Sequence, residues 1–175
     1  PMSGGDEAMI AAAVRGGDPG AFSLLYSRYR PLVFSVAWRI TGDPDVAEDV
    51  LQETFLQVSQ ALAAWRPEAK ISTWIYRIAV NEAIDERRRA RRRPSAGPVP
   101  ERAAEHVVPD RSIGDRISRA VSALPPRERA VFVLRHYQDL PLAEVADVLG
   151  IAIGTVKATL HHAVAKLAEE LKDLR

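Results

Sequence analysis

The side chains that stand out first by type and spacing are arginines. Six of the seven residues from 87 to 93 carry a guanidinium group. A charge run is usually a solvated face, but charges of one sign at this density repel one another unless a polyanion is bound. Because the run extends an amphipathic helix, we expect it to contact nucleic-acid phosphates. The polar side of that helix forms one line of residues, mostly four apart: Arg77, Asn81, Asp85, Arg88 and Arg92.

A second cluster is acidic and lies on a helix expected over 44–64. Its polar members fall outside the two apolar rows of that helix and are Asp45, Glu48, Asp49, Gln52 and Glu53. Two interpretations stay open. Acids in a first turn suit the positive end of the helix dipole and need no further role. A docking face for another protein is the alternative, and five acids or amides within nine residues favour it slightly.

The third stretch with a chemical pattern is 140–167, where two helical patterns flank a turn. Apolar residues recur at spacings of three and four over 142–149, Gly150 breaks the period, and a second apolar stripe follows over 156–167. This layout predicts a helix-turn-helix, whose second helix enters the major groove of DNA. An ordinary helical hairpin is the alternative.

No pattern in the sequence indicates covalent catalysis. The carboxylates lie mostly in first turns of helices, and no Ser/His/Asp set or metal-ligand spacing is present. His161 and His162 are adjacent on a helix and so point to different faces, and His136 is expected at a helix end. The chain has no cysteine, which excludes disulfides and thiolate metal sites. We therefore expect a protein that is not an enzyme and holds neither metal nor cofactor.

Length and composition describe an ordinary folded protein. At 175 residues, 47% hydrophobic and 27% charged, the chain allows one large or two small domains. No apolar run approaches the roughly 18 residues of a membrane span, and no signal-peptide pattern opens the sequence, so we expect a cytoplasmic protein that does not insert into a membrane. The net charge of +1 is uneven, because residues 1–60 hold four arginines and eight acids whereas 61–93 hold nine basic residues and four acids.

Helical periodicity predicts an all-α protein made of two small helical domains, 1–93 and 113–175, joined by a flexible linker over 94–112 that contains four prolines. We expect a kink or break near Arg30, before Pro31. Trp65 and Trp74 lie near the basic strip, where aromatic rings stack on unpaired bases, but the apolar pattern favours a core position for Trp74 and leaves Trp65 undecided. The expected helices are 6–15, 19–40, 44–64, 73–93, 113–124, 127–137, 142–149 and 154–171.

Two separate stretches resemble one family. Residues 49–55 (DVLQETF) and 72–79 (STWIYRIA), followed by Asn81, Asp85 and the arginines, are similar to domain 2 of the extracytoplasmic-function sigma factors. Residues 124–129 (LPPRER) and 154–157 (GTVK) are similar to their domain 4. The resemblance covers about 150 residues in the family's order and spacing. It implies a promoter-specificity subunit that binds core RNA polymerase and promoter DNA.

The resemblance also assigns roles to residues of domain 2. The helix matching the family's polymerase contact is expected to bind the clamp helices through Asp49, Leu51, Gln52, Glu53 and Phe55. Reading a melted −10 element requires a base to be taken out of the stack, and an amide such as that of Asn81 can both donate to and accept from a base edge. The residues expected at the −10 strand are Arg66, Lys70, Ser72, Arg77, Asn81, Asp85, Arg88 and Arg92.

In domain 4 the start of the last helix is expected to contact bases of the −35 element. Lys157 suits guanine, Thr155 a phosphate or base edge, and Ala158 a thymine methyl. The full set of expected −35 residues is Arg127, Arg129, Arg135, Thr155, Lys157, Ala158, Thr159, His161 and His162. The family often has GTVKSRLHRAR where this chain has GTVKATLHHAV, so weaker or altered −35 contact is expected, or an apolar face at Val164 for an inhibitory partner.

Regulation is expected to come from a separate anti-sigma factor, because family members are commonly held inactive by one that covers both domains. A helix-turn-helix regulator that acts without being a polymerase subunit is the alternative function. It explains 113–175 but not the acidic helix and basic strip of 1–93.

Overall fold

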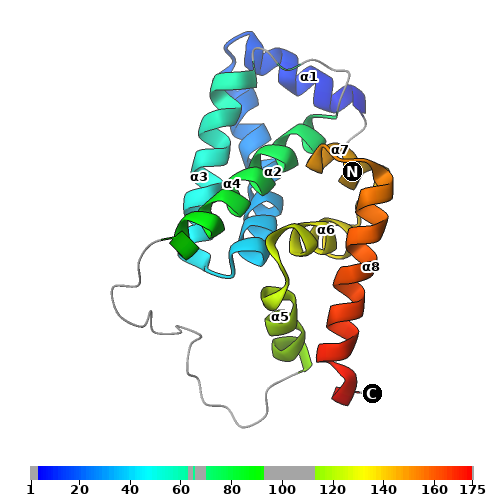
Figure 1. Cartoon of the computed structure of the whole chain (residues 1–175). Coiled ribbons are helices and arrows are strands. Elements are labelled where there is room, and N and C mark those ends of the chain that lie inside the picture. The colour runs from blue at the N-terminus through cyan, green and yellow to red at the C-terminus, as the bar shows by residue number, and fades with distance from the viewer. Residues whose placement is uncertain (1–3, 63–64, 66–69, 93–112, 175) are drawn as a thin grey trace.

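The computed structural model describes residues 4–62, 65, 70–92 and 113–174, and all the regular structure in them is helical (Figure 1). A first lobe contains four helices and a second lobe contains four more. The helices are α1 (Gly4–Arg15), α2 (Pro19–Thr41), α3 (Pro44–Ala61), α4 (Ile71–Arg92), α5 (Ile113–Ala123), α6 (Pro126–His136), α7 (Leu142–Leu149) and α8 (Ile153–Glu170), with a short 3-10 turn at Lys172–Leu174. The all-α prediction is confirmed, and the linker over 94–112 lies outside the described residues.

Helix ends follow from local sequence. The carboxylate of Asp18 accepts a hydrogen bond from the backbone N–H of Gly20 at 2.8 Å, and a prolyl residue follows each N-cap aspartate of α2 and α3. Gly42 and Gly150 end α2 and α7 in the left-handed conformation, with φ of 82° and 64°.

The expected break near Arg30 is wrong, because α2 continues through the exposed Pro31, with Tyr29 before it and Val33 after it buried. The alternative of a kink at this place stays a prediction.

The core of the first lobe lies between α2, α3 and α4. Leu25, Val33, Val58 and Ile75 are almost completely buried there. Trp65 is also buried, and Trp74 packs against the same cluster, so both rings serve the core. The apolar rows recognised in the sequence are the faces that pack.

The second lobe carries the expected helix-turn-helix. The helices α7 and α8 meet at an angle of 103° across the turn at Gly150. Val156 of α8 is fully buried, and Ala163 and Leu167 pack against α5. Within the described residues no single helix has both the length and the hydrophobicity to cross a membrane; α7 and α8 together meet those criteria only as a sharply bent pair.

The two lobes share one hydrophobic cluster. It contains Val36 and Ile40 of α2 and Val80 of α4 together with Leu134 of α6 and Val145 of α7. Figure 1 shows α6 and α7 against the first lobe, while α5 and the end of α8 extend away from it. Burial of apolar side chains therefore joins the lobes as well as stabilising each of them.

Two arginines complete this junction at the C-terminus of α2. Arg129 of α6 is fully buried and donates from Nη1 to the carbonyl oxygen of Ile40 at 2.7 Å. Arg87 of α4 donates to the same oxygen at 3.1 Å, to the carbonyl of Thr41 at 3.3 Å and to that of Ser122 at 3.0 Å. The last carbonyls of a helix have no partner within it and carry partial negative charge, so two guanidinium groups satisfy them.

The predicted contact of Arg129 with DNA phosphate is therefore wrong. Its side chain is 0% exposed and donates to backbone carbonyls of Ile40 and, at 3.4 Å, of Leu124. A buried guanidinium that gave up these acceptors would leave polar groups unsatisfied in the junction. Arg129 is a structural residue in this arrangement.

Further polar contacts cross the junction beside the arginines. The guanidinium of Arg39 lies 3.6 Å from the centre of the Tyr137 ring. The hydroxyl of Tyr76 donates to Oε1 of Gln138 at 3.1 Å, and Nε2 of Gln138 donates to Oγ of Ser35 at 3.3 Å. Burial raises the pKa of Tyr76 to about 12.

Replacing Arg129 with alanine removes one of the two donors to the carbonyl of Ile40 and the donor to that of Leu124, and leaves a cavity. We expect the free energy of unfolding to fall by about 2–4 kcal/mol, measured by urea denaturation followed through tryptophan fluorescence. Arg127→Ala removes the same charge from an exposed site on α6, and we expect it to change stability by less than about 0.5 kcal/mol. Equal losses in the two variants would contradict the structural role of Arg129.

The raised pKa of Tyr76 predicts a loss of stability at high pH. Above about pH 10 this phenol ionises in the unfolded chain but not yet in the folded one. The contribution of Tyr76 to the free energy of unfolding is therefore complete below that pH and is lost by about pH 12. We expect a fall of roughly 2–3 kcal/mol in the free energy of unfolding from this group across that window. The Tyr76→Phe variant, measured by urea denaturation at matched pH, is expected to lose less stability than the unaltered chain across this window. The same dependence of stability on pH in both proteins would rule the effect out.

Candidate functional site

The acidic face of α3 separates into exposed and buried residues. Asp49 and Gln52 are exposed and Glu53 is half-buried, as expected for a docking face. Leu51 and Phe55, predicted to contact polymerase with them, are 0% and 5% exposed and pack in the core of the first lobe. Their predicted contact is wrong, because they belong to the apolar row that faces α2 and α4.

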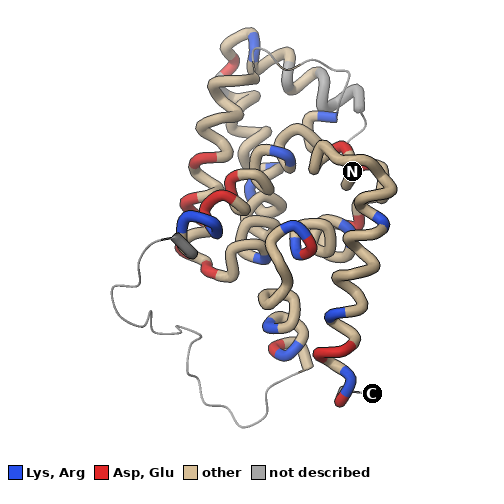
Figure 2. Tube along the Cα trace, in the orientation of Figure 1, with Lys and Arg blue, Asp and Glu red and all other residues tan. Residues whose placement is uncertain are grey.

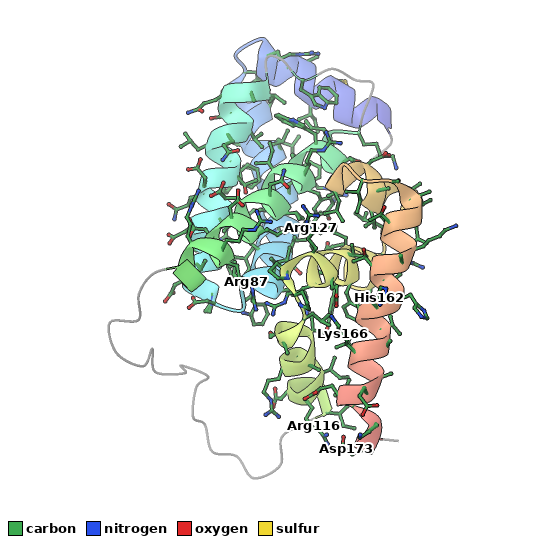
Figure 3. All side chains as sticks on the ribbon, viewed as in Figure 1. Arg87, Arg116, Arg127, His162, Lys166 and Asp173 are labelled. Atoms are coloured by element: carbon green, nitrogen blue, oxygen red, sulfur yellow. The ribbon has the colours of Figure 1, made fainter. Side chains whose placement is uncertain are left out.

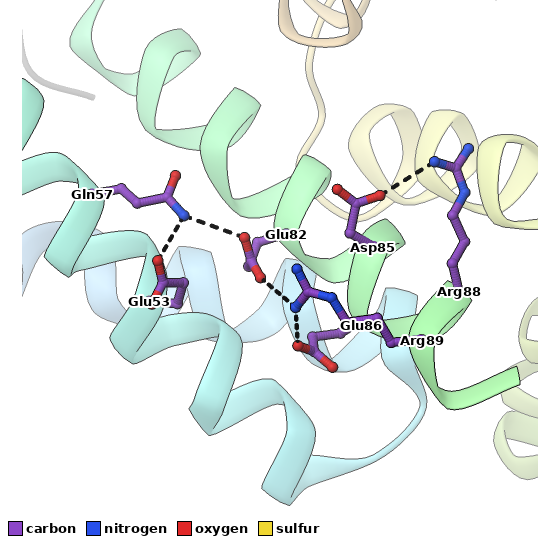
Figure 4. A network of polar contacts seen from close by, with 7 residues as sticks. All are labelled: Glu53, Gln57, Glu82, Asp85, Glu86, Arg88 and Arg89. Carbon is purple, nitrogen blue, oxygen red and sulfur yellow. Dashed lines mark hydrogen bonds and ion pairs between the residues drawn. The ribbon is translucent and has the colours of Figure 1, made fainter. Parts of the chain in front are cut away.

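A groove of about 480 Å³ runs between α3 and α4 and is lined mainly by acids. Its polar network is drawn in Figure 4: Nε2 of Gln57 donates to Glu53 at 2.9 Å and to Glu82 at 3.3 Å. Arg89 in turn donates to Glu82 at 3.3 Å and to Glu86. The neighbouring Glu86 carboxylate raises the pKa of Arg89 above its ordinary value. This network was not predicted from the sequence, although Glu82, Glu86 and Arg89 are spaced to lie on one face of a helix.

The arginine run at the end of α4 is not one uniform phosphate-binding surface. Arg87 points into the junction, and Arg89 is bound to the acids of the groove. Arg88 is exposed and forms an ion pair with Asp85 at 3.2 Å. Figure 2 shows basic and acidic residues close together at this end of the helix. The guanidinium groups thus divide between structural and surface roles.

The remaining expected −10 residues lie on or before α4. Arg77 and Asn81 are exposed, and Ser72 is half-buried. Lys70 forms an ion pair with Glu144 of α7 at 2.5 Å, and Arg77 donates to the carbonyl oxygen of Asp147 at 2.5 Å. Arg66 and the side chain of Arg92 lie outside the described residues. Lys70 and Arg77 are therefore both bound to α7, the first helix of the helix-turn-helix.

The expected −35 residues lie mainly on the exposed side of α8. Thr155, Lys157, Ala158, His161 and His162 are exposed, and Thr159 is half-buried. Figure 3 shows His162 projecting away from the body of the protein. On α6, which precedes the helix-turn-helix in the sequence, Arg127 is exposed and Arg135 is half-buried. Within the described residues, no group of three or more histidines or acids is arranged to hold a metal ion.

One cavity brings the two sets of DNA-binding candidates together. We call it the interlobe cavity; its volume is about 360 Å³. Asn81, Asp85 and Arg88 of α4 line one side of it, and Thr155 and Thr159 of α8 line another. Its remaining lining residues are Ile84, Arg127, Val131, Leu149 and Ile151.

Comparison with protein families divides the chain in the same way as its lobes. The model of sigma-70 region 2 matches residues 25–93, and that of sigma-70 region 4 matches residues 114–167. The ECF RNA polymerase sigma factor SigW of Bacillus subtilis (strain 168) is 30% identical over an alignment of 178 positions, which covers 92% of this chain and 94% of SigW. SigL of Mycobacterium tuberculosis (strain ATCC 25618 / H37Rv), also an ECF RNA polymerase sigma factor, is 37% identical over 156 residues, 86% of this chain and 88% of SigL.

Solved structures agree with these matches. CnrH, solved in complex with the cytosolic domain of CnrY, matches 95% of this chain and 97% of its own length with a TM-score of 0.72 and 26% identity. The sigma factor RpoE from Bartonella quintana, solved with the anti-sigma factor NepR, shares the fold with a TM-score of 0.72 at 24% identity, over 88% of this chain and 98% of RpoE. The chain therefore belongs to the extracytoplasmic-function (ECF) sigma factors of the sigma-70 family.

Proposed function

We propose that this chain binds core RNA polymerase and directs initiation at promoters through a −10 and a −35 element. The observation that carries the proposal is the pair of family matches, region 2 followed by region 4, on one chain. A helix-turn-helix regulator that acts alone would leave the region 2 match without a role. The chain itself performs no covalent step in this function; the polymerase supplies the chemistry.

The acidic face of α3 is the proposed polymerase contact. Asp49 and Gln52 are exposed on it, and Glu53 is held by Gln57 at the edge of the groove. A rigid helix that presents carboxylates in fixed positions suits a basic partner surface, because charge complementarity raises the rate and specificity of association. Leu51 and Phe55 support this face from below through their burial in the core.

The −10 strand is assigned to the polar line of α4 and the residues before it. The amide of Asn81 suits a base edge, and the side chains of Lys70, Arg77 and Arg88 suit phosphates. Arg66, Ser72, Asp85 and Arg92 remain predicted members of this surface.

The −35 element is assigned to α8, with Arg127 and Arg135 at phosphates on its flank. Thr155, Lys157, Ala158, Thr159, His161 and His162 are the side chains proposed to reach the groove. Only one of these six is a lysine and none is an arginine, so the phosphate attraction of this helix is weak.

An anti-sigma factor is the proposed regulator, and the cytoplasm the proposed location. Two solved structures of similar chains contain a partner: RpoE is bound to NepR, which is named as an anti-sigma factor, and CnrH is bound to the cytosolic domain of CnrY. Exposed apolar side chains such as Trp38 on α2 and Val164 on α8 offer surface for such a partner.

Reversing the charge of Asp49 tests the polymerase contact and the function together. With core polymerase and a library of promoter fragments, the unaltered chain is expected to start RNA at defined positions. Asp49→Arg is expected to weaken binding to core polymerase by about tenfold or more, because an exposed attractive charge becomes repulsive. Glu169→Arg at the exposed end of α8 is the matched control. Failure of the unaltered chain to direct any defined start would refute the proposed function.

The sparse basic charge on α8 predicts that base changes in the −10 element reduce initiation more than changes in the −35 element. His162→Arg adds one cation at an exposed position and is expected to steepen the slope of log binding constant against log salt on duplex fragments by about 0.9. His162→Gln is the neutral control. Greater sensitivity to −35 changes in the unaltered chain would contradict this prediction.

A further inference from the structure

The interlobe cavity has the size and the lining of a small-molecule site. Its volume of about 360 Å³ falls in the range of about 300–1,000 Å³ that is usual for pockets holding small ligands. Part of the lining is aliphatic: Val131 and Ile84 are buried, and Leu149 and Ile151 are half-buried. A ligand with an aromatic or apolar part gains free energy by covering these side chains.

Three helices each contribute one face to this cavity. Within each helix the lining residues are three or four positions apart, which places them side by side. They are residues 81, 84, 85 and 88 of α4, residues 127 and 131 of α6, and residues 155 and 159 of α8. Because helices hold these positions, the polar groups are arranged before a ligand arrives, and less ordering is needed on binding.

The charged groups of the lining are two guanidiniums and one carboxylate. Arg88 and Arg127 are both exposed, and Arg88 pairs with Asp85 at 3.2 Å. An ion pair between exposed side chains contributes little, so Arg88 exchanges it for a phosphate at small cost. Guanidinium groups bind phosphate through two parallel hydrogen bonds, and the hydroxyl groups of Thr155 and Thr159 are further donors. This part of the lining suits a phosphate group.

The other polar groups of α4 suit the edge of a base. Asn81 and Asp85 are four positions apart and line the cavity together. The amide of asparagine both donates and accepts, which matches the amino group and N7 of adenine. A carboxylate only accepts, so Asp85 favours an exocyclic amino group and repels a carbonyl oxygen such as O4 of uracil. The pair therefore selects a base that carries an amino group.

We propose that the interlobe cavity binds a free nucleoside monophosphate whose base carries an exocyclic amino group, of which adenosine 5′-monophosphate (AMP) is the probe. Arg88 and Arg127 bind the phosphate, and Asp85 accepts from the amino group. The ring of the base covers Leu149 and Ile151. The ligand is a free nucleotide because a space of about 360 Å³ holds one nucleotide unit rather than a strand. The site is independent of the proposed function, since it requires neither polymerase nor promoter.

Isothermal titration calorimetry of the full chain with AMP tests the site without polymerase or DNA. We expect a dissociation constant on the order of 10–100 μM, as for a ligand of roughly 20 non-hydrogen atoms. Inorganic phosphate is expected to bind at least about 30-fold more weakly, because it covers none of the aliphatic lining. A dissociation constant above about 1 mM for AMP, or equal affinities for AMP and inorganic phosphate, would overturn the proposal.

Two variants test the assigned contacts by the same titration. Arg127→Gln removes one phosphate contact and is expected to weaken AMP binding about tenfold, whereas Arg28→Gln removes the same charge from an exposed site on α2 and changes it less than about twofold. Uridine 5′-monophosphate is expected to bind at least about fivefold more weakly than AMP to the unaltered chain, and within about twofold of AMP to Asp85→Asn, whose amide also donates. Equal losses in the two arginine variants, or the same preference for AMP with and without the Asp85 carboxylate, would contradict the site.

Methyl NMR of the 19.3 kDa chain locates the ligand and identifies its source. Saturating AMP is expected to shift the methyl resonances of Ile84, Leu149 and Ile151 and to leave those of Val58, in the core of the first lobe, in place. A single strand of about 12 adenosine nucleotides is expected not to shift the Leu149 and Ile151 resonances, because a strand held along α4 does not enter the cavity. Unshifted cavity resonances with AMP, or equal shifts with the strand, would overturn the proposal. None of these outcomes bears on the proposed function, which is measured with core polymerase and promoter fragments.

Discussion

The C-terminus of α2 is the point on which the rest of the structure depends. A helix that ends inside a protein leaves carbonyl oxygens without partners, and burial makes each of them costly unless a donor is supplied. Here Arg87 comes from the first lobe and Arg129 from the second, and both donate to the carbonyl of Ile40. Gly42 then turns the chain in the left-handed conformation, with its own N–H bonded to the carbonyl of Trp38. The hydrogen bonds that satisfy this helix end therefore connect two lobes that are far apart in the sequence.

The same requirement divides the charges of the protein into two groups. Arginines that point into the junction satisfy backbone carbonyls, as Arg129 and Arg87 do, and are not available to an external polyanion. Arg89 is exposed and is paired with the carboxylates of Glu82 and Glu86. Arg88, paired only with a neighbouring exposed acid, stays near the surface, where such a pair contributes little and exchanges readily for a phosphate. A basic run is therefore a poor measure of the number of phosphate contacts.

Much of the fold could be predicted from local sequence, because the period of apolar residues, N-cap aspartates and glycines determine where helices begin and end. The same period placed Leu51 and Phe55 in an apolar row, and it was the family resemblance that assigned them to an interface; the structure agrees with the period. Arg129 could not be recognised as buried, since its acceptor lies 89 positions away in the chain. The contacts of Lys70 and Arg77 with α7 are distant in the same way, and no local pattern encodes them.

The packing of the two lobes also gives a physical reason for threonine at position 159, where the family pattern quoted above has arginine. Thr159 lines the interlobe cavity together with Arg88 and Arg127, and Asp85 is the only carboxylate among the residues that line it. A third guanidinium there would face two like charges across a small, partly desolvated space, where repulsion is stronger than in bulk water. Arginine would add a cation to α8 but would oppose the packing of the two lobes around this cavity. Threonine at position 159 therefore lowers the basic charge of α8 and at the same time avoids repulsion between like charges in the interlobe cavity.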